Sequence, residues 1–142
     1  MKNKGFTIIE MLIVLTVIAI LVGMALPRFK GMQDEGNIAR AKGELRTLQT
    51  AIESFYIHND NELPDDLDDL EDAQPLIVEV LPTDPFDPGE DYGYDVDGQY
   101  YVIYSVGPDG DGEAEMDDNE VDESNGDSCI YVTNGTPKDT RP

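Results

Sequence analysis

The chain has few of the residues that enzyme active sites usually use. Its 142 residues include one histidine, one cysteine and no tryptophan. The motifs Gly-x-Ser-x-Gly and His-Glu-x-x-His are absent, and so is a phosphate-binding loop. His58 falls at the end of an expected helix, where a structural role is the simplest interpretation. The sequence therefore gives no support to an enzyme, including a membrane-tethered one.

An intramolecular disulfide is excluded, because Cys129 has no second cysteine to pair with. A small domain without a disulfide must be stabilised by packing, by assembly or by a metal ion. Cys129 lies in an apolar run with Ile130 and Val132, so we expect it to be a small buried side chain. A reactive or intermolecular thiol is the alternative.

Basic residues are scarce in the second half of the chain. Residues 60–142 contain 2 basic and 26 acidic side chains, whereas residues 1–59 contain 7 basic and 5 acidic ones. The formal net charge of -22 therefore comes from the second half. Such a surface repels phosphate, so no direct binding to nucleic acid is expected. It suits a solvated face or hard cations.

One long apolar run occupies residues 6–26, and Glu10 is its only charged residue. A helix of that length measures about 30 Å, which is enough to cross a membrane. A carboxylate inside the span costs about 2.5–3.5 kcal/mol and needs a partner. Cleavage between Gly5 and Phe6 would supply a free amine. Lys2 and Lys4 orient the N-terminus towards the cytoplasm.

Two other interpretations of this segment exist. A secretory signal would be cut after the apolar run, but Gly-Met-Ala at residues 23–25 leads directly into Leu26 and Pro27 and makes a weak site. A plain membrane anchor would leave Glu10 without a role.

The segment KGFTIIEMLIVLTVIAIL resembles the class III signal of type IV pilins and of the pseudopilins of type II secretion. The resemblance implies that a prepilin peptidase cuts after Gly5 and methylates the new N-terminal Phe6. It also implies that Glu10 pairs with the N-terminus of a neighbouring subunit during filament assembly.

An apolar stripe predicts an amphipathic helix after the membrane run. Its positions recur at steps of three and four residues: Ile38, Ala41, Leu45, Leu48, Ile52 and Phe55. A helix that lays this stripe on a small sheet is favoured over a coiled coil, because fewer than three heptads are present. Pro27 should kink or loosen the helix before it.

The remaining sequence predicts a short helix and a few strands. We expect the helix at residues 65–73, an extended connector at 81–88 and a last strand at 128–133. A hairpin is expected at residues 92–96 and 99–105 around Asp97-Gly98.

Four regions follow from these expectations: a leader (1–5), a membrane or filament-core helix (6–27), an amphipathic helix (28–60) and an acidic globular region (61–142). The expected fold class is α+β, with a long N-terminal helix packed on a small antiparallel sheet, as the resemblance to pilins implies.

Seven carboxylates crowd residues 105–121, together with glycines. Mutual repulsion among them is relieved by Ca²⁺, which takes 6 to 8 oxygen ligands. An EF-hand is rejected, because Ala114 stands where that loop needs glycine. A solvated acidic loop without metal is the alternative.

Residues 105–110 and 118–121 resemble two pieces of the calcium loop of the major pseudopilin of type II secretion. The resemblance implies these ligands: Val106 through its carbonyl, Asp109, Asp111, Asp118 and Glu120.

The expected function is that of a structural subunit in a homo-oligomeric helical filament, most like the major pseudopilin. The alternative is an extracellular type IV pilin for adhesion, motility or DNA uptake. The resemblance implies minor pseudopilins or pilins, the peptidase and an inner-membrane assembly platform as partners. It places the protein in the inner membrane as a single-pass protein with its C-terminal domain outside, and then in a periplasmic pseudopilus or an extracellular filament.

Overall fold

A single long helix, α1 (Ile8–His58), runs through both compact units of the protein, residues 1–36 and 37–142. The computed structural model describes residues 5–124 and 129–137. The backbone stays helical at Pro27, where the sequence predicted a kink or a loosened segment. Proline removes one hydrogen-bond donor, and the turns on either side retain their helical structure. Loosening of this segment in a filament stays a prediction.

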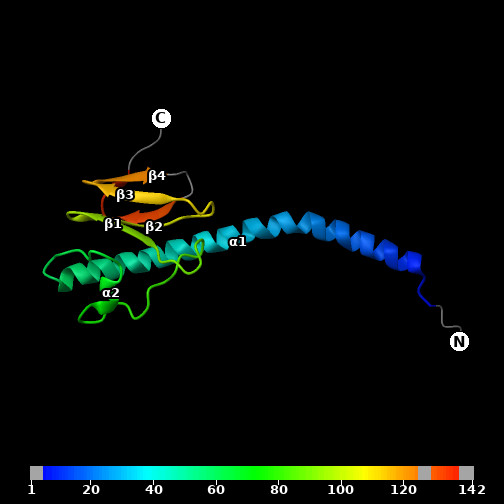
Figure 1. Cartoon of the computed structure of the whole chain (residues 1–142), viewed down its shortest axis with the longest axis horizontal. Helices are drawn as coiled ribbons and strands as arrows, with labels where there is room; N and C mark the ends of the chain where they lie inside the picture. Colours follow the sequence, from blue (N-terminus) through cyan, green and yellow to red (C-terminus); the bar gives the residue numbers. More distant parts are fainter. Residues whose placement is uncertain (1–4, 125–128, 138–142) are drawn as a thin grey trace. The chain divides into compact units, whose positions relative to one another are not determined.

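Residues 37–142 form three layers, which are the second half of α1 and two small sheets (Figure 1). The central sheet has the order β1-β2-β5, with the bounds β1 (Gly93–Asp97), β2 (Tyr100–Ser105) and β5 (Ile130–Thr133). The outer sheet has the order β3-β4-β6, with the bounds β3 (Glu113–Asp117), β4 (Glu120–Ser124) and β6 (Thr136–Pro137). All pairs are antiparallel except β4 with β6. The short helix α2 (Asp69–Asp72) lies in the connection from α1 to β1.

Strand β2 is buried on both of its faces. Tyr101 and Ile103 join the core that α1 covers, whereas Val102 joins a second core with Ala114, Met116 and Val121 of the outer sheet. This follows from the period of a strand, which sends successive side chains to opposite faces. The central sheet therefore separates two hydrophobic cores.

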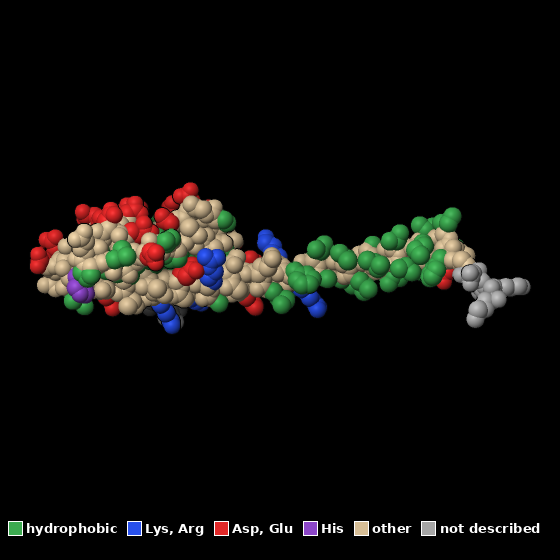
Figure 2. All heavy atoms as spheres, turned by 90° about the horizontal axis from the view of Figure 1, so that it is seen from below, with side chains coloured by type: hydrophobic (Ala, Val, Ile, Leu, Met, Phe, Trp, Pro, Cys, Tyr) green, Lys and Arg blue, Asp and Glu red, His purple; other side chains and the backbone are tan. Residues whose placement is uncertain are grey.

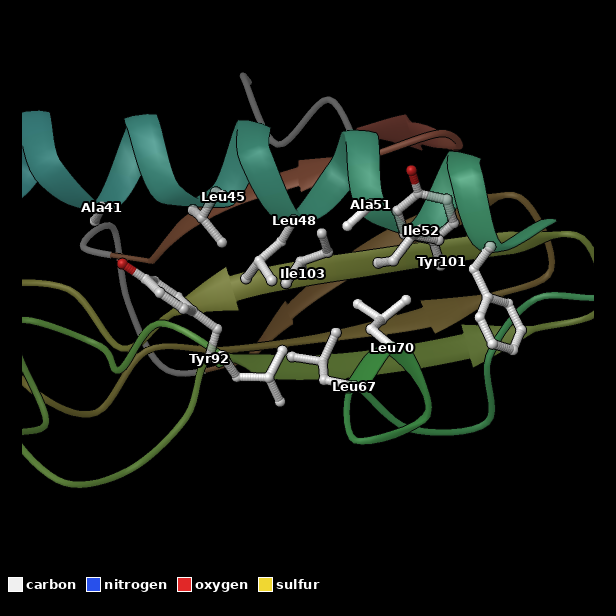
Figure 3. Packing of buried hydrophobic residues seen from close by; sticks show 12 residues of the cluster. Ala41, Leu45, Leu48, Ala51, Ile52, Leu67, Leu70, Tyr92, Tyr101 and Ile103 are labelled. Carbon is white, nitrogen blue, oxygen red and sulfur yellow. The ribbon is translucent and has the colours of Figure 1, made fainter. Parts of the chain in front are cut away.

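The amphipathic helix is confirmed. α1 buries Ala41, Leu45, Leu48, Ala51, Ile52 and Phe55 against the central sheet, α2 and the adjoining loops (Figure 3). Ile38 is only half buried. Each fully buried leucine or isoleucine contributes about 1.5–3 kcal/mol relative to exposure, so this stripe is a main source of the domain's stability. The predicted α+β fold class is confirmed as well.

The predicted hairpin and last strand are also confirmed, with small shifts. Asp97 pairs with Tyr100, so the two-residue turn is Gly98-Gln99 rather than Asp97-Gly98. Gly98 has a φ of 61°, as the first central residue of a type II′ turn requires. β5 pairs with β2 and completes the central sheet.

Three expectations from the sequence were wrong or incomplete. The helix predicted at residues 65–73 has only the four residues of α2, since residues 65–68 form bends and turns. The expected extended connector is a closed loop instead, in which Thr83 bridges Asp91. The acidic segment expected as a single metal loop contains the β3–β4 hairpin, which the sequence analysis missed.

Two buried tyrosines of the inner core differ in their polar contacts. The Tyr92 hydroxyl donates to Glu44 Oε2 at 2.6 Å, and Glu44 Oε1 accepts from Arg40 Nε at 2.8 Å. The Tyr101 hydroxyl is buried and has no hydrogen-bond partner among the described residues. Burial and the charge of Glu53 raise the pKa of Tyr101 from 10.0 to about 12, and the Gln49 side chain, which lies near the hydroxyl without forming a well-aligned hydrogen bond, opposes the shift.

We predict opposite effects for Tyr92→Phe and Tyr101→Phe at pH 7. Tyr92→Phe removes a hydrogen bond to a carboxylate and should cost about 1.5–3 kcal/mol. Tyr101→Phe removes a buried hydroxyl that lacks a partner, so stability should be unchanged or higher. Urea unfolding of the full chain in detergent would measure both changes, and equal destabilisation by the two variants would contradict the assignment.

Tyr101 also sets an alkaline limit. Above pH 10 the unfolded chain ionises this tyrosine, while the folded chain keeps it protonated up to about pH 12. Its contribution is complete below pH 10 and is lost as pH rises towards 12, because the unfolded state then binds fewer protons. Tyr101→Phe should flatten the fall in unfolding free energy over this interval.

Candidate functional site

The N-terminal junction lies in non-helical backbone directly before α1. Gly5, Phe6 and Thr7 have no regular secondary structure, and the Phe6 side chain is 72% exposed. Peptide bonds in exposed, irregular segments are the ones that proteases reach. Lys2 and Lys4 of the predicted leader lie outside the described residues.

Thr7 is the N-cap of α1, a role that the sequence analysis did not assign. The backbone N–H of Glu10 donates to Thr7 Oγ1 at 3.3 Å. The spacing Thr-x-x-Glu is the sequence signal of a capping box, in which the glutamate carboxylate also turns back to the cap. Within the described part of the chain, the Glu10 carboxylate forms neither that bond nor an ion pair. Glu10 thus keeps its carboxylate available for a group from outside the chain.

The first unit exposes almost all of its apolar surface. The side chains of the apolar run are open along their whole length, from Ile8 at 83% to Leu26 at 62% exposed. α1 is the one helix in the described ranges that is long and apolar enough to cross a membrane. An apolar area of this extent needs a cover, which is lipid or other helices.

The loop at residues 106–112 is held to the domain by a buried carboxylate, Asp84. Its Oδ1 accepts from Ser105 Oγ at 2.8 Å and from the Phe86 N–H at 2.9 Å. Its Oδ2 accepts from the Val106 N–H at 2.9 Å. Asp84 is 2% exposed and is not ion-paired within the described residues. Three donors thus replace the hydrogen bonds to water that the carboxylate loses on burial.

Glycines give this loop its shape. Gly107 and Gly110 have φ values of 73° and 77°, which other residues rarely adopt. A Cβ at Gly112 would lie 2.7 Å from the Val106 carbonyl oxygen and 3.0 Å from Cys129 Cα. The loop therefore packs directly on the chain that leads into β5.

Cys129 is half buried at this contact. Burial raises the pKa of its thiol to about 12, so the thiol is neutral at physiological pH. A neutral thiol is a poor nucleophile. This agrees with the expected apolar packing role rather than with the reactive alternative.

The predicted calcium ligands fall into two groups. Val106, Asp109 and Asp111 lie in the loop before β3, whereas Asp118 lies in the β3–β4 turn and Glu120 begins β4. The five residues of β3 separate these groups by about 16 Å. Ca²⁺ ligands lie 2.3–2.6 Å from the ion, so the five residues do not fit one ion in this fold.

One member of the predicted set already has a partner. The Val106 carbonyl accepts from the Gly112 N–H at 3.0 Å, whereas the Asp118 N–H donates to Asp97 Oδ2 at 2.9 Å and leaves the Asp118 carboxylate out of this contact. Among the described residues there is no group of three or more His, Cys, Asp or Glu side chains placed to hold a metal ion. Calcium binding stays a prediction from the sequence.

Comparisons with known proteins agree with this N-terminus. Residues 1–26 match the family described as the Prokaryotic N-terminal methylation motif. The chain therefore has a prepilin-type N-terminus, followed by a long helix and a small α+β domain.

The similar curated proteins are pilins and pseudopilins. Type II secretion system core protein G of Escherichia coli is 26% identical over 131 residues, which cover 82% of this chain and 89% of that protein. Core protein G of Pseudomonas aeruginosa is 27% identical over 143 residues, which cover 89% and 97%. The type IV major pilin protein PilA of Myxococcus xanthus is 41% identical over 59 residues, but these cover 42% of this chain and only 27% of that pilin. No solved structure matches the chain.

This chain is thus related to core protein G over most of its length and to type IV pilins over a shorter stretch. The predicted resemblance to type IV pilins and to the pseudopilins of type II secretion is confirmed.

We predict that Asp84→Ala destabilises the protein by about 2–3 kcal/mol, because one buried and two partly buried donors lose their acceptor. Asp87→Ala is the matched control, since Asp87 is exposed on the same loop, and it should change stability by less than about 0.5 kcal/mol. Urea unfolding followed by tyrosine fluorescence measures both. Equal midpoints for the two variants would show that Asp84 does not hold the loop.

Proposed function

We propose that this protein is the structural subunit of a type IV pilus-like filament, and specifically the major pseudopilin of a type II secretion system. The observation that carries the proposal is the exposed apolar half of α1 with one carboxylate, Glu10, that has no partner within the described chain. The relation to core protein G over most of the chain supports the specific assignment.

The proposed mechanism is mechanical. The subunit waits in the inner membrane as a single-pass protein with its globular domain on the outer side. A prepilin peptidase cuts after Gly5 and methylates Phe6. The new α-amine of one copy then neutralises Glu10 of another, which removes the cost of an unpaired charge among apolar helices. The α1 helices bundle in the filament core, and the acidic domains face water.

The proposed surroundings follow from this assignment. The filament is a periplasmic pseudopilus that is extended from an inner-membrane assembly platform and capped by minor pseudopilins. A catalytic role gains no support, since the relatives are structural proteins.

An extracellular type IV pilin for adhesion, motility or DNA uptake is the second candidate. The higher identity to PilA of Myxococcus xanthus favours it, although only 27% of that pilin is covered. The longer coverage of core protein G leads us to prefer the pseudopilus.

The role of calcium can be tested independently of assembly. Thermal unfolding would be measured with and without millimolar Ca²⁺ for the wild type, Asp109→Ala and Asp118→Ala. Because β3 separates the two aspartates, we expect any stabilisation by Ca²⁺ to respond differently to the two substitutions. Loss of the same stabilisation in both variants would instead support one shared ion.

We predict that Glu10→Ala is inserted and cut normally but assembles poorly, because the Phe6 amine of a neighbour loses its partner. The helix cap is preserved, since it uses the backbone N–H of residue 10. Mass spectrometry of the N-terminus measures cleavage, and the yield of sheared filaments measures assembly. Glu35→Ala, an exposed acid of α1 beyond the apolar run, is the control and should assemble normally. A normal filament yield from Glu10→Ala would refute the pairing.

A further inference from the structure

We propose that neighbouring copies associate head to tail, with the β3–β4 hairpin of one copy docked on the outward face of α1 in the next. The docking face is defined as Lys42, Arg46 and Thr50 of α1 together with residues 75–78. The proposal rests on the proposed filament function and specifies one contact between its subunits.

Charge is divided between the two partners of this contact. The sequence has no lysine or arginine from residue 59 to residue 137. All lysines and arginines of the described residues therefore lie on α1, while carboxylates gather along one side of the globular domain in the view of Figure 2. Arg40 forms an ion pair with Glu44 within α1. Between residues 59 and 137, the acidic surface of the domain carries no lysine or arginine of its own.

The docking face is open in the single copy. Arg46, Thr47 and Thr50 border a groove of about 620 Å³, whose other wall is residues 75–78. Leu76 in that wall is 63% exposed, and Val80 just beyond it is 74% exposed. Lys42 is exposed one turn before Arg46. It borders a second groove that contains Asp109, with which it forms no ion pair.

The hairpin presents the complementary charge. Its strand β3 alternates exposed acids with buried Ala114 and Met116; the exposed residues are Glu113, Glu115 and Asp117. Asp117 lies opposite Glu120 across the hairpin. Like charges directly opposite one another destabilise a sheet, so a cationic surface would stabilise this one.

The spacing of the charges also agrees. Residues four apart on a helix have Cβ atoms about 6 Å apart, as for Lys42 and Arg46. Alternate residues of a strand are about 7 Å apart, as for Glu113 and Glu115. Two adjacent cations can therefore face two adjacent carboxylates.

Within one copy this contact is impossible. The central sheet lies between α1 and the β3–β4 hairpin, so the two surfaces face opposite sides of the domain (Figure 1). A surface that binds its complement on the opposite side of an identical copy makes a heterologous contact. Such contacts generate a ring where the rotation between copies closes and a helical filament where it does not, and the proposed function requires the filament.

A charge-swap experiment on the full chain tests the contact in assembling cells. Lys42→Glu/Arg46→Glu should lower the yield of sheared filaments by about tenfold or more, because like charges then face each other. Adding Glu113→Lys/Glu115→Lys to the same chain should restore the yield. Adding Glu90→Lys, an exposed acid outside the hairpin, should not restore it.

Cross-linking gives a second, independent measurement. In a Cys129→Ser background, Arg46→Cys combined with Glu115→Cys should form disulfide-linked ladders in filaments, whereas each single variant should not. The wild type shows in parallel whether filaments form at all. If no filaments form, the proposed function fails.

Other outcomes overturn the contact while leaving the proposed function in place. One is normal filament yield from Lys42→Glu/Arg46→Glu. Another is a loss that the hairpin swap does not restore, which would indicate that the docking face binds something else, such as an anionic membrane surface. Absence of ladders in normal filaments of the double cysteine variant would also overturn it.

Discussion

The burial of β2 on both faces is the constraint on which the globular domain depends. Val102 and Ile103 point to opposite faces of the central sheet and are equally buried, so both faces of the sheet must be covered. α1 must cover one side and the β3–β4 hairpin the other, which fixes the order of the three layers. Asp84 stabilises this arrangement, because its carboxylate accepts hydrogen bonds that join the proline-rich loop to the end of β2.

The apolar part of α1 and the acidic globular domain need different surroundings. The apolar part of α1 needs lipid or other helices, and the acidic domain needs water or cations, so each region requires a different neighbour. Covalent cross-links contribute nothing to the fold, because the chain has one cysteine. Packing and a few buried hydrogen bonds stabilise the domain instead.

Sequence reasoning succeeded where a strong period or a local motif decides the structure. The stripe from Ala41 to Phe55 and the Gly98 turn are local signals, and residues 1–26 form a short motif that the family comparison matched. It failed where contacts between distant residues decide. The loop at residues 81–91 is closed by a backbone hydrogen bond from the Asp84 N–H to the Glu90 carbonyl, which no local sequence pattern predicts.

The β3–β4 hairpin was missed although its signal was present. Ala114 and Met116 alternate with acids at the period of a half-buried strand. Glutamate and aspartate are poor strand formers, so the segment was interpreted as a metal-binding loop instead. The two-residue turn at Asp118 and Asn119 then separates residues that the sequence had grouped in one metal site.

The unequal size of the two cores has a consequence for motion. The outer core has four buried residues, whereas the inner core has twelve. Regions with few buried apolar contacts open at lower free energy than the rest of a domain. The packing of the outer sheet on the central sheet should therefore open locally at a lower free energy than the packing of α1, and amide hydrogens of β3 and β4 should exchange faster than those of β2. A subunit built in this way has a compliant outer layer on a stiff helical backbone.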